Sequence, residues 1–113
     1  MKNLDFMNDG KRIYFNDAQN RLAGEVSYFA LPEYNALVCE RVFVAPELRG
    51  QGVAEKLMLA FINYVKEQQQ QIYPLCPYAK RFFAKYPEYN SLNIQHDLTE
   101  SKIRDMQNEK EQQ

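Results

Sequence analysis

The chain is poor in cysteine and has no long apolar run, and each shortage excludes a class of protein. Two cysteines, Cys39 and Cys76, are too few for a disulfide scaffold and are not spaced as metal ligands, so we expect no metal site. The longest apolar run, residues 57–62, is far shorter than the roughly 20 residues that span a bilayer. The first residues also lack the apolar segment of a signal peptide. We therefore expect no contact with a membrane and a cytoplasmic location.

An excess of one charge is missing as well. Fourteen basic and fifteen acidic side chains leave a net charge of −1, which does not suit a dedicated nucleic-acid binder. With 45% hydrophobic residues among 113, the chain can build one core but not two. We expect a single domain over residues 1–113.

The first half of the chain predicts three antiparallel strands. They cover residues 11–15, 21–30 and 34–45, and turn-forming residues separate them at 16–20 and 31–33. Alternating polar and apolar residues in the second segment are typical of a half-buried strand. The end of the third, 42–45, is apolar at every position, which indicates a strand in the middle of a sheet.

The second half predicts helices around one short strand. Apolar residues at three- and four-residue spacing indicate a helix from Val53 towards 67, followed by a strand at 71–75. Pro77 opens a second helix to about residue 85 or 86, and a possible capping box at 97–100 predicts a last helix from about Leu98. A strand reached through a helix can lie parallel to the strand before it. The fold class is therefore α+β, with a mixed, mostly antiparallel sheet.

Two of the four glycines, Gly50 and Gly52, lie between the third strand and the first helix. A helix N-terminus offers unpaired amides and the positive end of the helix dipole, and glycine lets a phosphate approach the backbone closely. Arg49 adds a positive charge. A tight turn that merely needs glycine is the alternative reading. No Walker sequence is present, and Glu55 stands where a dinucleotide fingerprint needs a small residue.

The stretch 49–54, Arg-Gly-Gln-Gly-Val-Ala, resembles the Gln/Arg-x-x-Gly-x-Gly/Ala signature of the GNAT acyltransferase superfamily. Residues 72–80 are similar to the Cys-Pro-Tyr segment of a family of very small GNAT-like N-acetyltransferases. The resemblance covers about residues 10–90 and leaves 91–113 as a polar extension. It implies acetyl-CoA as the cofactor, with the thioester polarised by the main-chain N–H of Val44. The residues expected to bind coenzyme A are Val44, Arg49, Gly50, Gln51, Gly52, Val53, Ala54, Cys76 and Tyr78.

Within this resemblance Cys76 takes the place of an asparagine beside the thioester, and Phe83 that of a tyrosine that protonates the leaving thiolate. Tyr78, Tyr86 or water would have to replace that acid. A thiol at a helix N-terminus has a lowered pKa, which favours a nucleophile that carries the acetyl group. A non-covalent wall of the active site and a plain core residue are the two alternatives for Cys76. Cys39 is predicted to be a core residue.

The general base is harder to assign. Glu40 is a candidate, and Arg41 stands where the small family commonly has a histidine. Their opposite parities predict that only one of the two faces the cleft. His96 lies in the polar tail and is expected at the surface.

The function predicted is acetyl transfer from acetyl-CoA to an amine or thiol, on a small-molecule or peptide acceptor, by a monomer or a homodimer. A coenzyme A-binding or interaction module without turnover is the alternative, since the usual tyrosine and histidine are absent.

Overall fold

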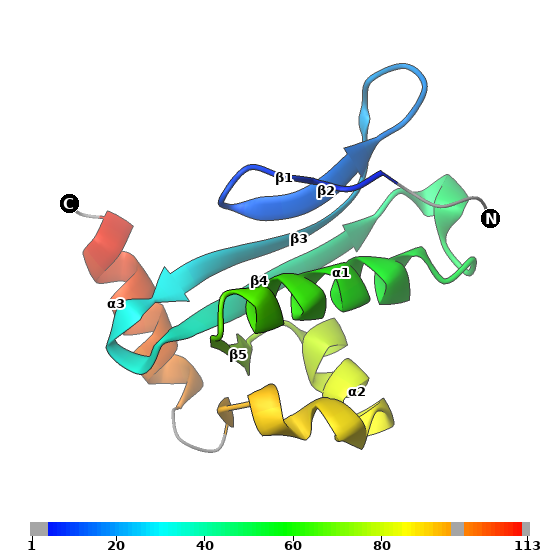
Figure 1. The fold of residues 1–113 in the computed structure, drawn as a ribbon. Helices are drawn as coiled ribbons and strands as arrows, with labels where there is room; N and C mark the ends of the chain where they lie inside the picture. The colour runs from blue at the N-terminus through cyan, green and yellow to red at the C-terminus, as the bar shows by residue number, and fades with distance from the viewer. Residues whose placement is uncertain (1–4, 96–98, 112–113) are drawn as a thin grey trace.

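A single mixed sheet forms the centre of the molecule. The structure is a computed structural model that describes residues 5–95 and 99–111. Its five strands follow the order β1-β2-β3-β4-β5, antiparallel except for the parallel pair β4 and β5 (Figure 1). Their bounds are β1 Met7–Asn8, β2 Arg12–Asn16, β3 Leu22–Leu31, β4 Ala36–Val44 and β5 Gln71–Pro74.

Three α-helices pack on this sheet: α1 (Val53–Glu67), α2 (Pro77–Lys85) and α3 (Glu100–Glu111). The buried residues of α1 follow the three- and four-residue spacing that predicted the helix: Val53, Leu57, Met58, Phe61, Ile62 and Val65. Short 3-10 turns cover Pro32–Tyr34, Pro46–Leu48 and Pro87–Leu92. The α+β class and the mostly antiparallel sheet are confirmed. None of the helices in 5–95 and 99–111 is long and apolar enough to cross a membrane.

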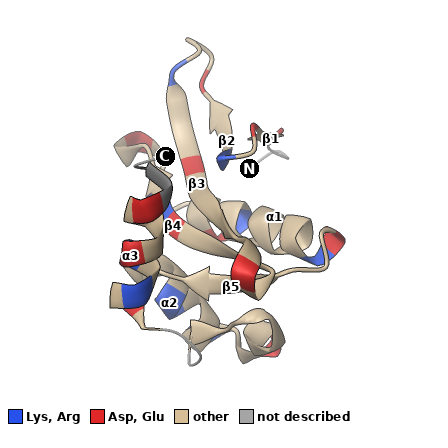
Figure 2. Ribbon diagram, turned by 90° about the vertical axis from the view of Figure 1, so that its left-hand side faces the viewer, with Lys and Arg blue, Asp and Glu red and all other residues tan. Residues whose placement is uncertain are grey.

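The expectation of one core was wrong, because helices cover both faces of the sheet and alternate residues of β4 are buried in two separate cores. Leu37 and Cys39 belong to the larger core, which α1 and α2 complete on one face of the sheet. Ala36 and Val38 belong to the smaller one, where Ile103 of α3 is fully buried on the opposite face. The C-terminal helix therefore covers a face that neither α1 nor α2 reaches, as the views in Figures 1 and 2 agree.

The structure departs from the sequence predictions at a few elements. Strand β1 and the 3-10 turn at Pro87–Leu92 were not expected, and both are too short to give a periodic pattern. The predicted last helix exists, but its N-terminal cap is Thr99, whose Oγ1 accepts from the N–H of Lys102 at 3.2 Å. Asp97 and Leu98, on which the capping prediction rested, lie outside the described residues, as does His96.

Candidate active site

Strands β4 and β5 separate partway along their length. Their parallel pairing runs from Ala36 opposite Gln71 to Cys39 opposite Pro74. There the carbonyl of Cys39 accepts two bonds, from the N–H of Leu75 at 3.0 Å and of Cys76 at 3.2 Å. Beyond this point β5 turns into α2, since Pro77 opens that helix. The C-terminal half of β4 thus loses its neighbour on one side.

The edge of β4 that β5 leaves unpaired presents main-chain N–H and C=O groups at every second residue. The N–H of Ala45 bonds to the carbonyl of Ala23 at 2.8 Å, which fixes the alternation of the β3–β4 ladder. Val44 opposite Gly24 and Val42 opposite Val26 are then the positions that do not bond to β3. Their N–H and C=O groups point away from β3, towards the opening. The predicted polariser, the N–H of Val44, therefore faces the side where β4 and β5 diverge.

The glycine turn follows directly on this strand. Gly50 and Gly52 have φ of +80° and +79°, a left-handed backbone conformation that residues other than glycine rarely adopt. A Cβ built on either residue would meet no atom of the protein within 4 Å, so both face open space. Within the described residues, the N–H groups of 50–55 donate no hydrogen bond to any protein atom. Gly52 is the N-cap of α1, which has no side-chain cap. Successive free amides at a helix start are a binding site for an anion.

Arg49 holds the turn against β4. Its Nε donates to the carbonyl of Val44 at 2.9 Å, while the residue as a whole stays exposed. Gln51 points elsewhere, since its Nε2 donates back to the carbonyl of Glu47 at 3.3 Å. A cavity of about 240 Å³ opens here, lined by the turn, by Val44 and by Tyr78. The contiguous residues that the sequence predicted as cofactor-binding thus lie at one cavity, with the side chain of Gln51 the exception.

Cys76 is the N-cap of α2, and its sulfur accepts from the N–H of Ala79 at 3.4 Å. The pKa of this thiol falls to about 6. The largest cause is a bond from the Cys39 thiol, and the N–H groups of Ala79, Tyr78 and Val42 act in the same direction against the effect of burial. The lowered pKa favours the thiolate form of Cys76 near neutral pH.

Cys39 was predicted as a core residue, and it is fully buried. The structure adds a role that the sequence did not reveal, because the Cys39 thiol interacts with Cys76 and lowers its pKa. The same interaction, together with burial, raises the pKa of Cys39 well above its ordinary value. One cysteine of the pair is therefore held as a thiol and the other is stabilised as a thiolate. Their separation by 37 positions in the chain gave no spacing signal.

The tyrosines around Cys76 differ in what they can reach. Tyr78 lines both the cavity of the glycine turn and the cavity of Cys76, so it lies between the two. Burial, followed by the nearby Glu55 charge, raises the pKa of Tyr78. The Tyr86 hydroxyl donates to Glu55, and this bond raises the pKa of Tyr86. Phe83 is buried in the larger core, so no acid stands at its position.

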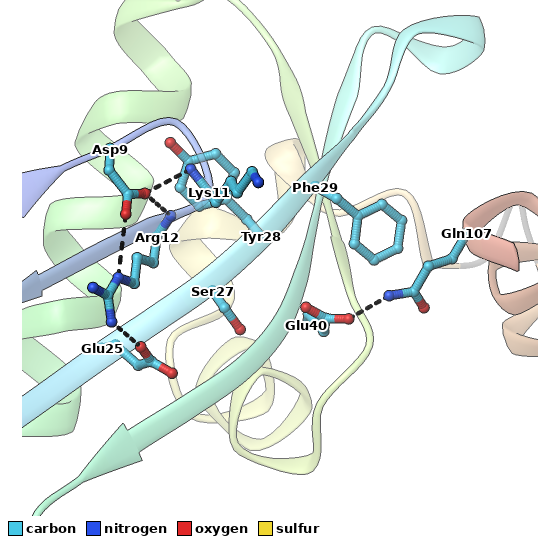
Figure 3. Close-up of a pocket in the computed structure, with 9 residues that line it drawn as sticks. All are labelled: Asp9, Lys11, Arg12, Glu25, Ser27, Tyr28, Phe29, Glu40 and Gln107. Atoms are coloured by element: carbon cyan, nitrogen blue, oxygen red, sulfur yellow. Dashed lines mark hydrogen bonds and ion pairs between the residues drawn. The ribbon is translucent and has the colours of Figure 1, made fainter. Parts of the chain in front are cut away.

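Glu40 lines two larger cavities, one of which is drawn in Figure 3. The cavity that contains Cys76 has a volume of about 530 Å³. The second cavity, which lies over β2 and β3 and is lined by Arg12, Glu25 and Ser27 among others, has a volume of about 620 Å³. Glu40 and Gln107 line both, and Oε2 of Glu40 accepts from Nε2 of Gln107 at 2.5 Å. The candidate base therefore reaches the cavity of the candidate nucleophile, with α3 as the wall behind it.

The prediction that only one of Glu40 and Arg41 faces the cleft was wrong, because both line the cavity of Cys76. The reason is a β-bulge. Ser27 pairs with Arg41 and Tyr28 with Cys39, so Glu40 is an extra residue without a partner on β3. A bulge breaks the strict alternation of side chains on which the parity argument depended.

Comparison with known proteins agrees with this geometry. Residues 12–92 match the model of a protein family described as GCN5-related N-acetyl-transferase. No curated protein matches the chain significantly. Among solved structures, a GCN5-like protein from Staphylococcus aureus, provisionally assigned as an N-acetyltransferase, is 28% identical with a TM-score of 0.67, over 83% of this chain and 91% of that chain.

Two further structures show the fold alone. Tetrahymena GCN5 is 12% identical with a TM-score of 0.56, over 69% of this chain and 51% of that one. A protein from Agrobacterium tumefaciens, provisionally assigned as an acetyltransferase, is 21% identical with a TM-score of 0.53, over 73% and 58%.

Strand β4 leads through the glycine turn and α1 to the parallel strand β5, which then diverges from β4, and this arrangement fits an acyltransferase of the GNAT class. The family match covers well over half of the chain, so the chain belongs to the GCN5-related N-acetyltransferase family. Membership makes it an N-acetyltransferase and implies the use of acetyl-CoA. The narrower resemblance of residues 72–80 to a Cys-Pro-Tyr segment stays a prediction.

Proposed function

We propose that the protein transfers the acetyl group of acetyl-CoA to an amine in two steps, with Cys76 as the carrier. The observation that supports this most is the place of the Cys76 sulfur at the N-terminus of α2, where it accepts from the N–H of Ala79 at 3.4 Å, with the Cys39 thiol nearby lowering its pKa. Such an arrangement stabilises a thiolate, which is the nucleophilic form of cysteine. A cysteine that served only as packing would need none of these donors.

The glycine turn is the binding site proposed for the pyrophosphate. The free amides of 50–55 and the dipole of α1 suit two phosphate groups, and the open space in front of Gly50 and Gly52 admits them. Tyr78 links this cavity to that of Cys76, so an extended ligand bound at the turn can pass Tyr78 to the sulfur. The residues therefore fit coenzyme A, which supplies the acetyl group as a thioester.

In the first step the Cys76 sulfur bonds to the acetyl carbon, and the bond from that carbon to the coenzyme A sulfur breaks. The N–H of Val44 donates to the carbonyl oxygen as negative charge develops there. The Tyr78 hydroxyl, which a raised pKa keeps protonated at neutral pH, would give its proton to the departing coenzyme A thiolate. Tyr78 would then regain a proton from water, and Glu40 would release to water the proton that it takes in the second step.

In the second step an amine nitrogen attacks the same carbon. The bond to Cys76 breaks, the thiolate returns, and the proton lost by the nitrogen passes to the Glu40 carboxylate. A sulfur of low pKa is a weaker nucleophile but a better leaving group, so the bonding around Cys76 favours this second transfer. The comparisons lend no support to a module without turnover.

Intact-mass measurement tests the carrier role. Incubation with acetyl-CoA, without acceptor, should add about 42 daltons to the protein, and Cys76→Ala should abolish the adduct. Cys39→Ser is the matched control, since it changes the other cysteine but keeps a donor, and it should still gain the mass. An adduct on the Cys76→Ala protein, or none on the natural one although acetyl-CoA binds, would refute the carrier role.

A further inference from the structure

The cavity around Cys76 has an excess of positive side chains. The Glu100 carboxylate forms two ion pairs: its Oε2 lies 3.3 Å from Nζ of Lys80, and its Oε1 lies 3.0 Å from a guanidinium nitrogen of Arg104. Figure 2 shows the charged positions of α2 and α3 close together on this side of the molecule. Four cations and two carboxylates line the cavity: Arg41, Lys80, Arg81 and Arg104, with Glu40 and Glu100.

Charges outside the cavity do not cancel this excess. Arg41 contacts Glu25 at 3.5 Å, but Arg12 binds the same carboxylate more closely, at 3.1 Å. Arg81 makes no ion pair within 5–95 and 99–111, and it is exposed at the cavity. At least one guanidinium that lines the cavity of Cys76 is therefore available for a ligand.

The negative end of the cavity is equally available. Glu40 contacts the neutral amide of Gln107, and no cation pairs with it in the described part of the chain. It lines both the cavity of Cys76 and the larger cavity over β2 and β3. The site thus offers a carboxylate for an amine and a cationic wall for a second group of opposite charge.

We infer that the acceptor is an amine that also bears an anionic group, a carboxylate or a phosphate, and that Arg81 recognises this group. The inference rests on the proposed function. The amine approaches the acetylated Cys76 on the side of Glu40, while the anion stays at the cationic wall of α2 and α3. An amine without an anionic group leaves Arg81 without a partner and binds more weakly.

Paired alkylating reagents test the charge pattern without any acceptor. Iodoacetate and iodoacetamide both bond to the Cys76 sulfur with loss of iodide, and they differ in one negative charge. The ratio of their rate constants, iodoacetate over iodoacetamide, should exceed that of 2-mercaptoethanol by about tenfold, and should fall in about 0.5 M salt. Cys76→Ala protein should show no labelling, since Cys39 is fully buried. A ratio at or below that of the free thiol would overturn the inference.

Variants locate the effect. Arg81→Gln should lower the ratio about threefold or more, because the rate with iodoacetate should fall by more than the rate with iodoacetamide. Lys102→Gln is the control: it removes the same charge from an exposed position of α3 that does not line the cavity, and it should leave the ratio as it was. An unchanged ratio in the Arg81→Gln protein would also overturn the inference.

Matched acceptors then separate the two anions. Coenzyme A release should be at least about tenfold more efficient, in kcat/KM, with phosphoethanolamine than with ethanolamine if a phosphate is bound, or with lysine than with cadaverine if a carboxylate is bound. Equal or lower efficiency of both anionic members contradicts the acceptor class. If the protein nevertheless gains the acetyl mass, the acceptor class is refuted and the carrier role of Cys76 stands. If the protein prefers iodoacetate but never acquires the acetyl group, the proposed function is refuted and the charge pattern of the cavity stands.

Discussion

The cofactor side of this site uses mainly backbone groups, whereas the acceptor side uses side chains. The cofactor side comes mainly from one stretch, Val44 to Glu55, joined by Tyr78, and the amides of 50–55 are its main donors. The acceptor side combines side chains of β4, α2 and α3, with Glu40 and Gln107 in contact across 67 positions of sequence. A backbone site depends on conformation and tolerates many side chains, whereas a side-chain site changes with every substitution. The same fold can therefore keep one cofactor and vary its acceptor.

The largest effect that separates the two sides is expected at Gly52. Gly52→Val places a branched side chain at a φ of +79° and in the space proposed for the phosphates, so affinity for coenzyme A should fall at least about 100-fold in calorimetry. Gly10→Val is the matched control, because Gly10 has a φ of +89° and equally open surroundings but lies at the β1–β2 turn. Equal affinity of both variants would contradict the pyrophosphate assignment.

Removing the anchor of α3 should damage the acceptor side alone. Ile103 is fully buried, so Ile103→Ala should cost about 2–5 kcal/mol of the docking of α3, seen as faster amide hydrogen exchange in that helix. Acetyl transfer to an acceptor should drop while coenzyme A affinity stays constant. Met106→Ala, at a half-buried position of the same helix, should have a smaller effect on both exchange and transfer. A parallel loss of coenzyme A affinity in the Ile103→Ala protein would show that the two sides are not separate.

The cysteine pair lies where the two sides meet, and its bond can be removed by one substitution. The rate of Cys76 alkylation by iodoacetamide should rise with pH as the thiolate forms, with a midpoint near the pKa of about 6. Cys39→Ala removes the main donor and should move the midpoint to higher pH, while Cys39→Ser retains a donor and should keep it low. A midpoint that Cys39→Ala leaves unchanged would assign the low pKa to the helix terminus alone.

The smallest effect is expected at Arg49, whose guanidinium holds the Val44 carbonyl at 2.9 Å. Arg49→Ala should weaken coenzyme A binding only about three- to tenfold, because the amides of the turn remain. Arg49→Lys keeps the charge but not the planar donor, so it separates attraction for phosphate from positioning of β4. Loss of affinity as large as that of Gly52→Val would mean that the side chain, and not the backbone, binds the ligand.

The same contrast explains how much the sequence could predict. Local signals were sufficient for β2 to β5, for α1 and α2 and for the glycine turn, since periodicity and turn residues act over a few positions. The bulge at Glu40 was not predictable, because an extra residue in a strand leaves the hydrophobic pattern almost unchanged. The contact of Cys39 with Cys76 and that of Glu40 with Gln107 needed the fold, since pairing across strands and helices has no fixed spacing.

We propose that coenzyme A lies along the glycine turn and reaches Cys76, while α3 contributes to the acceptor side. Titration of ¹⁵N-labelled protein with coenzyme A tests it directly. The amides of 50–55, of Val42 and Val44, and of Cys76, Tyr78 and Ala79 should shift. Those of the hairpin turn at 17–21 and of the outer face of α3 should not. Shifts confined to α3, or amides of 50–55 that stay in place at saturation, would contradict the account.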